Sequence, residues 1–410
     1  MKDPGRYVRR LSPMERYALV IHALHPYHVD AVVEGEGSID PEQLRLAIAA
    51  AAAANPAIRV RLRGRLGYCR WVDSGIAPLL HVIDGVEWDA RSEAFAPYTL
   101  ASLDPARGGA VAEMILLRTP SGRCWLIGRA VHAALDGRGM LHWMRELFRA
   151  LRGEALLGSD NRRTDLQVQM THQQRVTDQP PAPQSCLAVL PAQTPAGELA
   201  YVWRRLEIPA QPAHMLARTA QFLAAYARQQ GEGAVGFTIP VDFRALRDES
   251  MGLGNLTGYL RLNIAPDDTP RTLMRQLQQR LRAYADCRVI GGLRFVPWMP
   301  LAYMVRQLRA QLDQVLYASN PHLPSGGIVS MGQLAPDWFD APGFRGRQAF
   351  AIPGAVGKLN VVFVQYPGFT TVTFAAPRAY NHEGQLDRMI AAFSEHFAGA
   401  ELRAELESAS

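Results

Sequence analysis

Cysteine is scarce in this chain, which has only Cys69, Cys124, Cys186 and Cys287 among 410 residues. No two of them form a CxxC pair, and four widely separated cysteines match neither a disulfide framework nor a zinc site. We therefore expect no metal centre and no disulfide scaffold. A reducing compartment suits such a chain, and we predict a cytoplasmic location.

Long apolar runs are also missing. No stretch reaches the roughly 20 apolar residues that a membrane-spanning helix needs. The N-terminal segment MKDPGRYVRRLSPMERY has no apolar core of the kind that a signal peptide carries. We expect no membrane association.

A large excess of one sign of charge is lacking as well. The chain has 44 Lys and Arg and 38 Asp and Glu, which gives a net charge of +6. Basic residues do not gather into runs and no nucleic-acid motif occurs, so we expect no nucleic-acid partner. The mild positive balance suits small or acidic anionic partners, such as a phosphopantetheine arm, coenzyme A or an acidic carrier protein.

The periodicity of apolar residues predicts a mixed α/β chain in two halves. A proline-rich segment at 177–199 has little periodicity and is typical of a linker. We predict an N-terminal lobe at 1–176 and a C-terminal lobe at 200–410. The predicted strands are 27–34, 57–65, 110–117, 124–130, 200–207, 234–241, 259–264, 327–331, 359–366 and 370–375, and the predicted helices are 41–54, 140–153, 213–230, 270–287, 301–317 and one beginning near 383.

Arginine alternates with apolar residues in the predicted strand at 57–65, at positions 59, 61, 63 and 65. One interpretation is a phosphate-binding stripe. The other, which the pattern alone favours, is the solvated face of an edge strand, where charge discourages aggregation.

One short motif carries chemistry. Residues 130–139 are AVHAALDGRG, so the strand predicted at 124–130 leads into His132, with Asp136 four residues later and Gly137 next. Imidazole is suited to accept a proton from a hydroxyl or amine near neutral pH. Glycines allow backbone angles that other residues resist. His132 is therefore the candidate general base, and Asp136 could hold the turn or pair with an arginine.

Further segments follow one another in an order that resembles a known superfamily. They are LSPMER at 11–16, NPAIR at 55–59, HAALDG at 132–137, VDFR at 241–244, GLGN at 252–255 and VSMG at 329–332. Together they resemble the superfamily of peptide-synthetase condensation domains, chloramphenicol acetyltransferase and the plant-type and polyketide-associated acyltransferases. The resemblance extends along most of the chain.

The resemblance implies a fold of two chloramphenicol-acetyltransferase-like α/β sandwich lobes with the active-site tunnel between them. His132 would lie in the tunnel, and Asp136 would form a structural salt bridge with the second-lobe arginine at the matching position, Arg244. Asp136, Gly137 and Arg244 would thus support the site without taking part in the chemistry.

The implied reaction moves an acyl group from a thioester to a hydroxyl or amine of a small-molecule acceptor, in natural-product biosynthesis. The donor would be acyl-coenzyme A or a phosphopantetheine thioester on an acyl or peptidyl carrier protein. We expect this donor to be supplied in trans, no tightly bound cofactor, and a monomer.

The sequence departs from the family in places, of which two bear on the site. Condensation domains usually carry two adjacent histidines, but the first position here is Val131. This favours a free-standing acyltransferase over a modular peptide-bond former. The late "SNxG" segment has Met331 in place of its asparagine, which leaves Ser330 as a candidate for hydrogen bonding to the tetrahedral intermediate.

Two alternative functions stay open. The chain could be a free-standing condensation enzyme that joins two carrier-bound substrates, or a non-catalytic condensation-like module that binds carrier proteins. The intact His132, Asp136 and Gly137 speak against the second, because a binding module has no chemical need for them.

A run of three histidines, His22, His25 and His28, is the remaining candidate for a metal cluster. Its spacing fits no standard site, and side chains on the strand that starts at 27 would not converge. A structural or surface role is the favoured interpretation.

Overall fold

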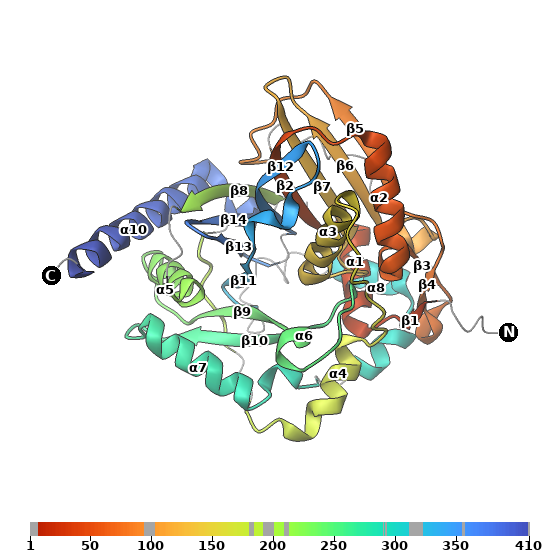
Figure 1. Ribbon diagram of the computed structural model, residues 1–410. Helices are drawn as coiled ribbons and strands as arrows, with labels where there is room; N and C mark the ends of the chain where they lie inside the picture. The colour runs from red at the N-terminus through yellow and green to blue at the C-terminus, as the bar shows by residue number, and fades with distance from the viewer. Residues whose placement is uncertain are drawn as a thin grey trace.

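The computed structural model describes residues 7–93, 103–179, 184–191, 201–208, 213–289, 291, 293–310, 323–354 and 357–408. It confirms the predicted α/β architecture of two lobes, each built around its own sheet (Figure 1). Among the described helices, none is both long enough and apolar enough to cross a membrane.

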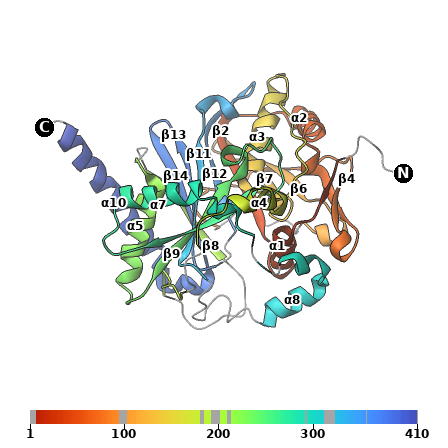
Figure 2. The ribbon, with the colours of Figure 1, turned by 90° about the horizontal axis from the view of Figure 1, so that it is seen from below.

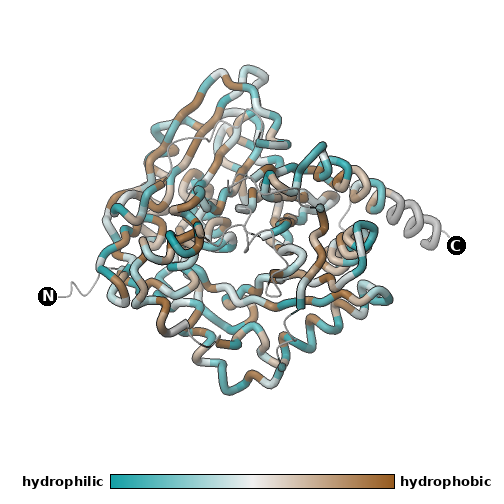
Figure 3. The backbone as a smooth tube through the Cα atoms, turned by 180° about the vertical axis from the view of Figure 1, so that it is seen from behind, coloured by the Kyte–Doolittle hydropathy of each residue, from teal (hydrophilic) through white to brown (hydrophobic). Residues whose placement is uncertain are grey.

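A five-stranded sheet forms the centre of the first lobe. Its strand order is β12 (Phe344–Pro353), β2 (His28–Gly37), β7 (Arg123–Val131), β6 (Ala112–Arg118) and β5 (Leu79–Asp84). Helices α2 (Pro41–Ala54) and α3 (Gly137–Leu151) pack together and bury the apolar core on one face of it. Brown hydrophobic segments run along its strands in Figure 3.

Helix α2 has the bounds that the sequence predicted, and its local contacts explain why. Asp40 caps the helix, because its side chain accepts a hydrogen bond from the Gln43 N–H at 2.9 Å, and Pro41 occupies the first helical position. Its buried positions recur at helical spacing. They are Leu44, Ala47, Ile48, Ala51 and Ala52.

The second lobe contains a six-stranded sheet. Its order is β10 (Thr257–Ile264), β9 (Val235–Asp242), β11 (Gly326–Gln333), β13 (Asn360–Tyr366), β14 (Phe369–Pro377) and β8 (Tyr201–Ile208). Strand β11 runs parallel to β9 and β13, whereas the other pairs are antiparallel. Helices α5 (Met215–Arg228), α7 (Pro270–Arg282) and α10 (Gln385–Ser408) contribute side chains to this core and gather on one side of the sheet in Figure 2.

A small antiparallel sheet of β1 (Val8–Arg10), β4 (Arg70–Asp73) and β3 (Val60–Arg63) lies at the outer end of the first lobe. Strand β3 is an edge strand, as the arginine alternation predicted. The other helices are α1 (Pro13–Leu24), α4 (Asp165–His172), α6 (Phe243–Leu246) and α8 (Leu301–Ala310). Short 3-10 helices occur at Pro56–Arg59, Leu66–Tyr68, Pro105–Arg107, Gln173–Arg175, Ala285–Cys287, Leu293–Trp298, Pro336–Phe339, Arg378–Tyr380 and His382–Gly384.

The second half of the chain contributes one strand to the first-lobe sheet. Strand β12 comes from the second half of the chain but lies beside β2 of the first lobe (Figure 1), and their pairing places Phe350 opposite Val32. No pattern in the sequence predicts this strand. The division of the chain at 176 and 200 stays a prediction, to which the structure adds that residues 344–353 belong to the first-lobe sheet.

Part of the predicted linker also packs into a lobe. The Leu187 N–H donates to the Ala234 carbonyl at 2.8 Å, and Val189 and Leu190 are buried in the second-lobe core. Residues 180–183 and 192–199 of this segment lie outside the described residues.

Three tryptophans join the lobes on the sheet face opposite α2 and α3. Trp88 and Trp125 of the first lobe have ring centroids 5.4 Å apart, and Trp88 lies 6.3 Å from Trp203 on β8. Aromatic pairs of this kind contribute beyond the area they bury. Trp203 therefore connects the two cores.

Replacement of Trp203 by alanine should lower the free energy of unfolding by about 3–5 kcal/mol, because it leaves a large cavity at the lobe interface. The matched control is Trp298→Ala, since Trp298 is 53% exposed; its effect should stay within about 1 kcal/mol. Urea unfolding measures the loss for both variants. It is monitored by far-UV circular dichroism, because tryptophan fluorescence would itself change with the substitutions. Equal effects of the two variants would contradict the interface role.

Candidate active site

His132 lies at the junction of strand and helix that the sequence predicted. Its N–H donates to the Tyr27 carbonyl at 3.0 Å, and the Ala134 N–H donates to the Val131 carbonyl at 2.8 Å. The chain thus leaves β7 in a tight turn and enters α3. Asp136 caps that helix by accepting a hydrogen bond from the Gly139 N–H at 2.8 Å.

The imidazole of His132 is half-buried and stacks on the ring of Tyr27, with centroids 4.8 Å apart and planes 20° from parallel. Burial lowers the pKa of His132 below 6.5, while a hydrogen bond to its own backbone carbonyl and the charge of Asp136 act in the opposite direction. Only Nδ1 can reach the residue's own carbonyl. We therefore expect Nδ1 to carry the proton and Nε2 to keep the lone pair for a ligand.

Asp136 and Arg244 form a buried ion pair across the lobes. Arg244 Nη1 lies 3.1 Å from Asp136 Oδ2, and Nη2 lies 3.1 Å from both carboxylate oxygens. The side chains are only 6% and 5% exposed. A pair this deep has to be fully hydrogen bonded to offset its desolvation.

Both the arginine and the carboxylate have these further hydrogen bonds. Arg244 also donates to the carbonyls of Gly252 and Gly254 at 2.7 Å each, and to Asp242 Oδ1 at 2.8 Å. Asp136 Oδ2 further accepts from the Leu256 N–H at 2.9 Å and the Thr257 hydroxyl at 3.0 Å. The carboxylate is therefore engaged on every side by donors from both lobes.

Two residues that the sequence did not mark as site residues hold the turn itself. The Asn255 amide donates to the His132 carbonyl at 2.9 Å and to the Ala133 carbonyl at 3.2 Å. Arg9 donates to the Ala134 carbonyl at 3.2 Å and is ion-paired with Glu15. Asn255 belongs to the segment GLGN, and Arg9 pairs with Glu15 of the segment LSPMER. These two segments carried part of the resemblance and could have pointed to both roles.

The glycines of the motif act by close approach, which corrects the expectation that they supply unusual backbone angles. Neither Gly137 nor Gly139 has a positive φ. A Cβ on Gly139 would lie 2.2 Å from the Leu253 carbonyl oxygen, and one on Gly137 would lie 3.0 Å from Met331 Cε. Their missing side chains let the second lobe pack against the start of α3.

Ser330 lies on β11, next to Met331, whose side chain reaches Gly137. Because side chains alternate along a strand, the Ser330 side chain points to the opposite face of the sheet from that of Met331, and Ser330 is exposed. Its hydroxyl accepts a hydrogen bond from the Gly332 N–H at 3.3 Å. A role for Ser330 in stabilising an intermediate stays a prediction.

The three histidines of the H-x2-H-x2-H run have packing partners. His22 accepts from the Tyr27 N–H at 3.0 Å and contacts the ring of His28, with centroids 5.2 Å apart, so these two side chains do approach each other. His25 packs on Tyr201. Burial and the charge of Arg129 lower the pKa of His28 to about 2. Within the described ranges, no group of three or more ligating side chains could hold a metal.

No family model matches the sequence, and no curated protein matches it. Solved structures do resemble the fold. The first condensation domain of the calcium-dependent antibiotic synthetase, in complex with a substrate analogue, aligns with a TM-score of 0.66 at 18% identity over 97% of this chain and 96% of that one.

Two further condensation domains align over nearly the whole chain. A variant of the starter condensation domain of rhizomide synthetase RzmA, in complex with C8-CoA and Leu-SNAC, has a TM-score of 0.64 at 15% identity and covers 95% of this chain and 93% of its own. The condensation domain of the Monacolin K polyketide synthase MokA has a TM-score of 0.60 at 12% identity, with coverages of 95% and 97%. The chain therefore has the two-lobe condensation-domain fold.

Breaking the buried pair from one side should be strongly destabilising. We expect Asp136→Asn and Arg244→Gln each to lower the free energy of unfolding by about 3–5 kcal/mol, because each leaves a buried polar or charged partner unsatisfied. The double variant should lose less than the sum of the two. Chemical denaturation of the three proteins gives the coupling energy.

The control for this double-mutant cycle of Asp136 and Arg244 is Arg347→Gln. It removes an ion pair with Glu36 in which both side chains are more than half exposed. Its effect should be about 1 kcal/mol or less. If Arg244→Gln were no more destabilising than Arg347→Gln, the pair would not connect the lobes energetically.

Proposed function

We propose that this protein is an acyltransferase that moves an acyl group from a thioester donor to a hydroxyl or amine acceptor, with His132 as general base. The observation that carries the proposal is the half-buried imidazole of His132, whose pKa is lowered by burial, stacked on Tyr27 and held at a turn that both lobes stabilise. It occurs in a fold whose solved examples are condensation domains.

In the proposed reaction, Nε2 of His132 accepts the proton of the acceptor hydroxyl or amine as its oxygen or nitrogen attacks the thioester carbonyl. The tetrahedral intermediate then collapses, the carbon–sulfur bond breaks, and the imidazolium returns the proton to the leaving thiolate. The acyl group passes directly to the acceptor, so the step needs no acyl-enzyme. Holding the two substrates together supplies much of the rate gain.

Asp136 and Arg244 position the base in this mechanism and do not exchange protons. The carboxylate of Asp136 is saturated by Arg244, two backbone N–H groups and a hydroxyl, which leaves it no capacity to act as an acid or base. Gly137 lets Met331 of the second lobe approach the turn. These three residues therefore act through His132.

The donor in this proposal is a thioester, on coenzyme A or on the phosphopantetheine arm of a carrier protein. One of the similar structures contains C8-CoA together with Leu-SNAC, and another contains a substrate analogue. Val131, at the position of the first of two adjacent histidines in condensation domains, is fully buried and cannot supply a second imidazole. This supports a free-standing acyltransferase acting on a small-molecule acceptor.

The experiment that tests the proposal measures thiol release and product mass with a panel of acyl-coenzyme A and acyl-carrier donors. His132→Ala should reduce turnover by about 10²–10⁴-fold, the usual contribution of a general base. The matched control is His382→Ala, because the side chain of His382 is 45% exposed and belongs to the C-terminal region; it should retain wild-type turnover.

Equal activity of wild type and His132→Ala would refute the assignment of the base. If folded wild type released no thiol from any donor with hydroxyl or amine acceptors, while it still bound acyl-carrier protein, the non-catalytic binding function would replace the present proposal.

The pH dependence of turnover gives an independent check. His132 acts as a base only when neutral, and burial lowers its pKa below 6.5. Activity should therefore fall as the pH decreases, with the midpoint of the acidic limb of kcat/KM below 6.5. A midpoint at or above 6.5 would contradict a buried imidazole as the base.

A further inference from the structure

Four arginines share one face of the small β1-β4-β3 sheet. Arg10, Arg70 and Arg63 stand directly opposite one another across the three strands, and Arg61 lies two residues from Arg63 on the same strand. Cross-strand partners and residues two apart point to the same face of a sheet. We call these residues, Arg10, Arg61, Arg63 and Arg70, the arginine face.

The charges of the arginine face are not neutralised internally. None of the four forms an ion pair with a carboxylate of the residues that the structure describes. Nearby Asp73 is bound by Arg59 at 2.8 Å, and Asp104 is 3.5 Å from Arg107. Like charges placed directly opposite each other are destabilising. Burial and the charge of Arg63, two residues along the same strand, lower the pKa of Arg61.

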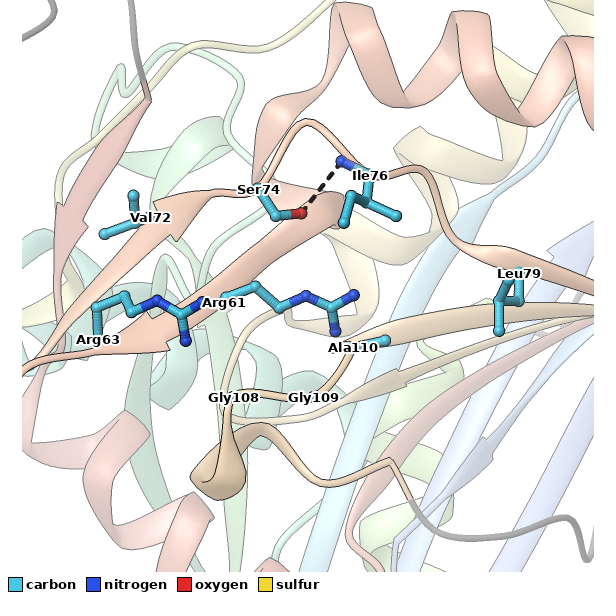
Figure 4. A pocket seen from close by; sticks show the side chains of 9 residues that line it. All are labelled: Arg61, Arg63, Val72, Ser74, Ile76, Leu79, Gly108, Gly109 and Ala110. Carbon is cyan, nitrogen blue, oxygen red and sulfur yellow. Dashed lines mark hydrogen bonds between the residues drawn. The ribbon is translucent and has the colours of Figure 1, made fainter.

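A pocket of about 550 Å³ adjoins this face (Figure 4). Its lining residues are Arg61, Arg63, Val72, Ser74, Ile76, Leu79, Gly108, Gly109 and Ala110. In Figure 4 the guanidinium of Arg61 extends between Ser74 and Ala110, and its Nη1 atom is buried without a hydrogen-bond partner. A buried donor of this kind is costly to leave unpaired. The volume is typical of small-molecule sites.

Apart from Ser74 and the glycines, the remaining lining residues are apolar. Ile76 and Leu79 are 60% and 63% exposed although both are large hydrophobic residues. Gly108 has a φ of +79° and no Cβ, which lets the Arg63 guanidinium lie against the loop, since a Cβ there would be 2.8 Å from Arg63 Nη1. The pocket therefore offers the guanidinium groups of Arg61 and Arg63 at one end and an apolar surface at the other, and the row of arginines continues outside it with Arg70 and Arg10.

We propose that the arginine face and its pocket bind a small molecule that carries clustered phosphate groups on an apolar or aromatic body. Guanidinium groups match phosphate oxygens in bidentate geometry, and several of them together favour a ligand with more than one negative charge. The hollow shape favours a small ligand over a flat protein surface. The proposal does not depend on the reaction at His132.

The test is isothermal titration calorimetry of the whole protein with inorganic pyrophosphate and with adenosine 3′,5′-bisphosphate. Wild type should bind at least one of them saturably at one site, more weakly as salt is raised. Arg61→Gln with Arg63→Gln should weaken binding at least tenfold. The matched control, Arg271→Gln with Arg275→Gln on the exposed side of α7, removes the same charge elsewhere and should leave affinity unchanged.

Absence of saturable binding by wild type, or equal losses in the two double variants, would overturn the proposal. If the Arg61 and Arg63 variant failed to fold by circular dichroism, Arg10→Gln with Arg70→Gln, which removes the part of the row outside the pocket lining, serves as the second test, with a loss larger than that of the control expected. Tighter binding of the bisphosphate than of pyrophosphate identifies a nucleotide-like ligand, whereas equal binding identifies recognition of the phosphates alone.

Discussion

The buried ion pair of Asp136 and Arg244 is the interaction on which the site depends. It connects the turn after β7 to the second lobe through a network of donors in which neither charge is left unsatisfied. Such a pair contributes little net stability compared with apolar packing, but separating its partners would leave an uncompensated buried charge. Asn255 and Arg9 then hold the carbonyls of His132, Ala133 and Ala134. The position of the imidazole follows from these contacts.

The rest of the lobe junction supports the same arrangement by different means. Strand β12 extends the first-lobe sheet with residues from the second half of the chain, so the two lobes cannot separate as rigid bodies without breaking a ladder of backbone hydrogen bonds. Trp203 packs beside Trp88 on the far face of that sheet. At the start of α3, Gly139 allows the Leu253 carbonyl to approach where any side chain would collide. The site is thus assembled from both lobes.

Much of this could be predicted from local signals. The cap at Asp40, the apolar strand that ends at Val131 and the helix after Gly137 depend on interactions between residues a few positions apart, and they lie close to the predicted positions. The pairing of Asp136 with Arg244 was implied only by the resemblance of VDFR to a known motif. Strands β1, β4, β5 and β12 were not predicted, because they are short or depend on partners distant in the chain.

By itself the sequence determined the fold class, the candidate base His132 and the alternation of arginines on β3, because each depends on residue type and short-range periodicity. Only the tertiary structure decided what surrounds them. It placed Tyr27 on the imidazole, and it aligned Arg10 and Arg70 with Arg63 beside a pocket. The physical reason is that cross-strand register and side-chain packing join residues far apart in the chain, and no local pattern encodes which of them will meet.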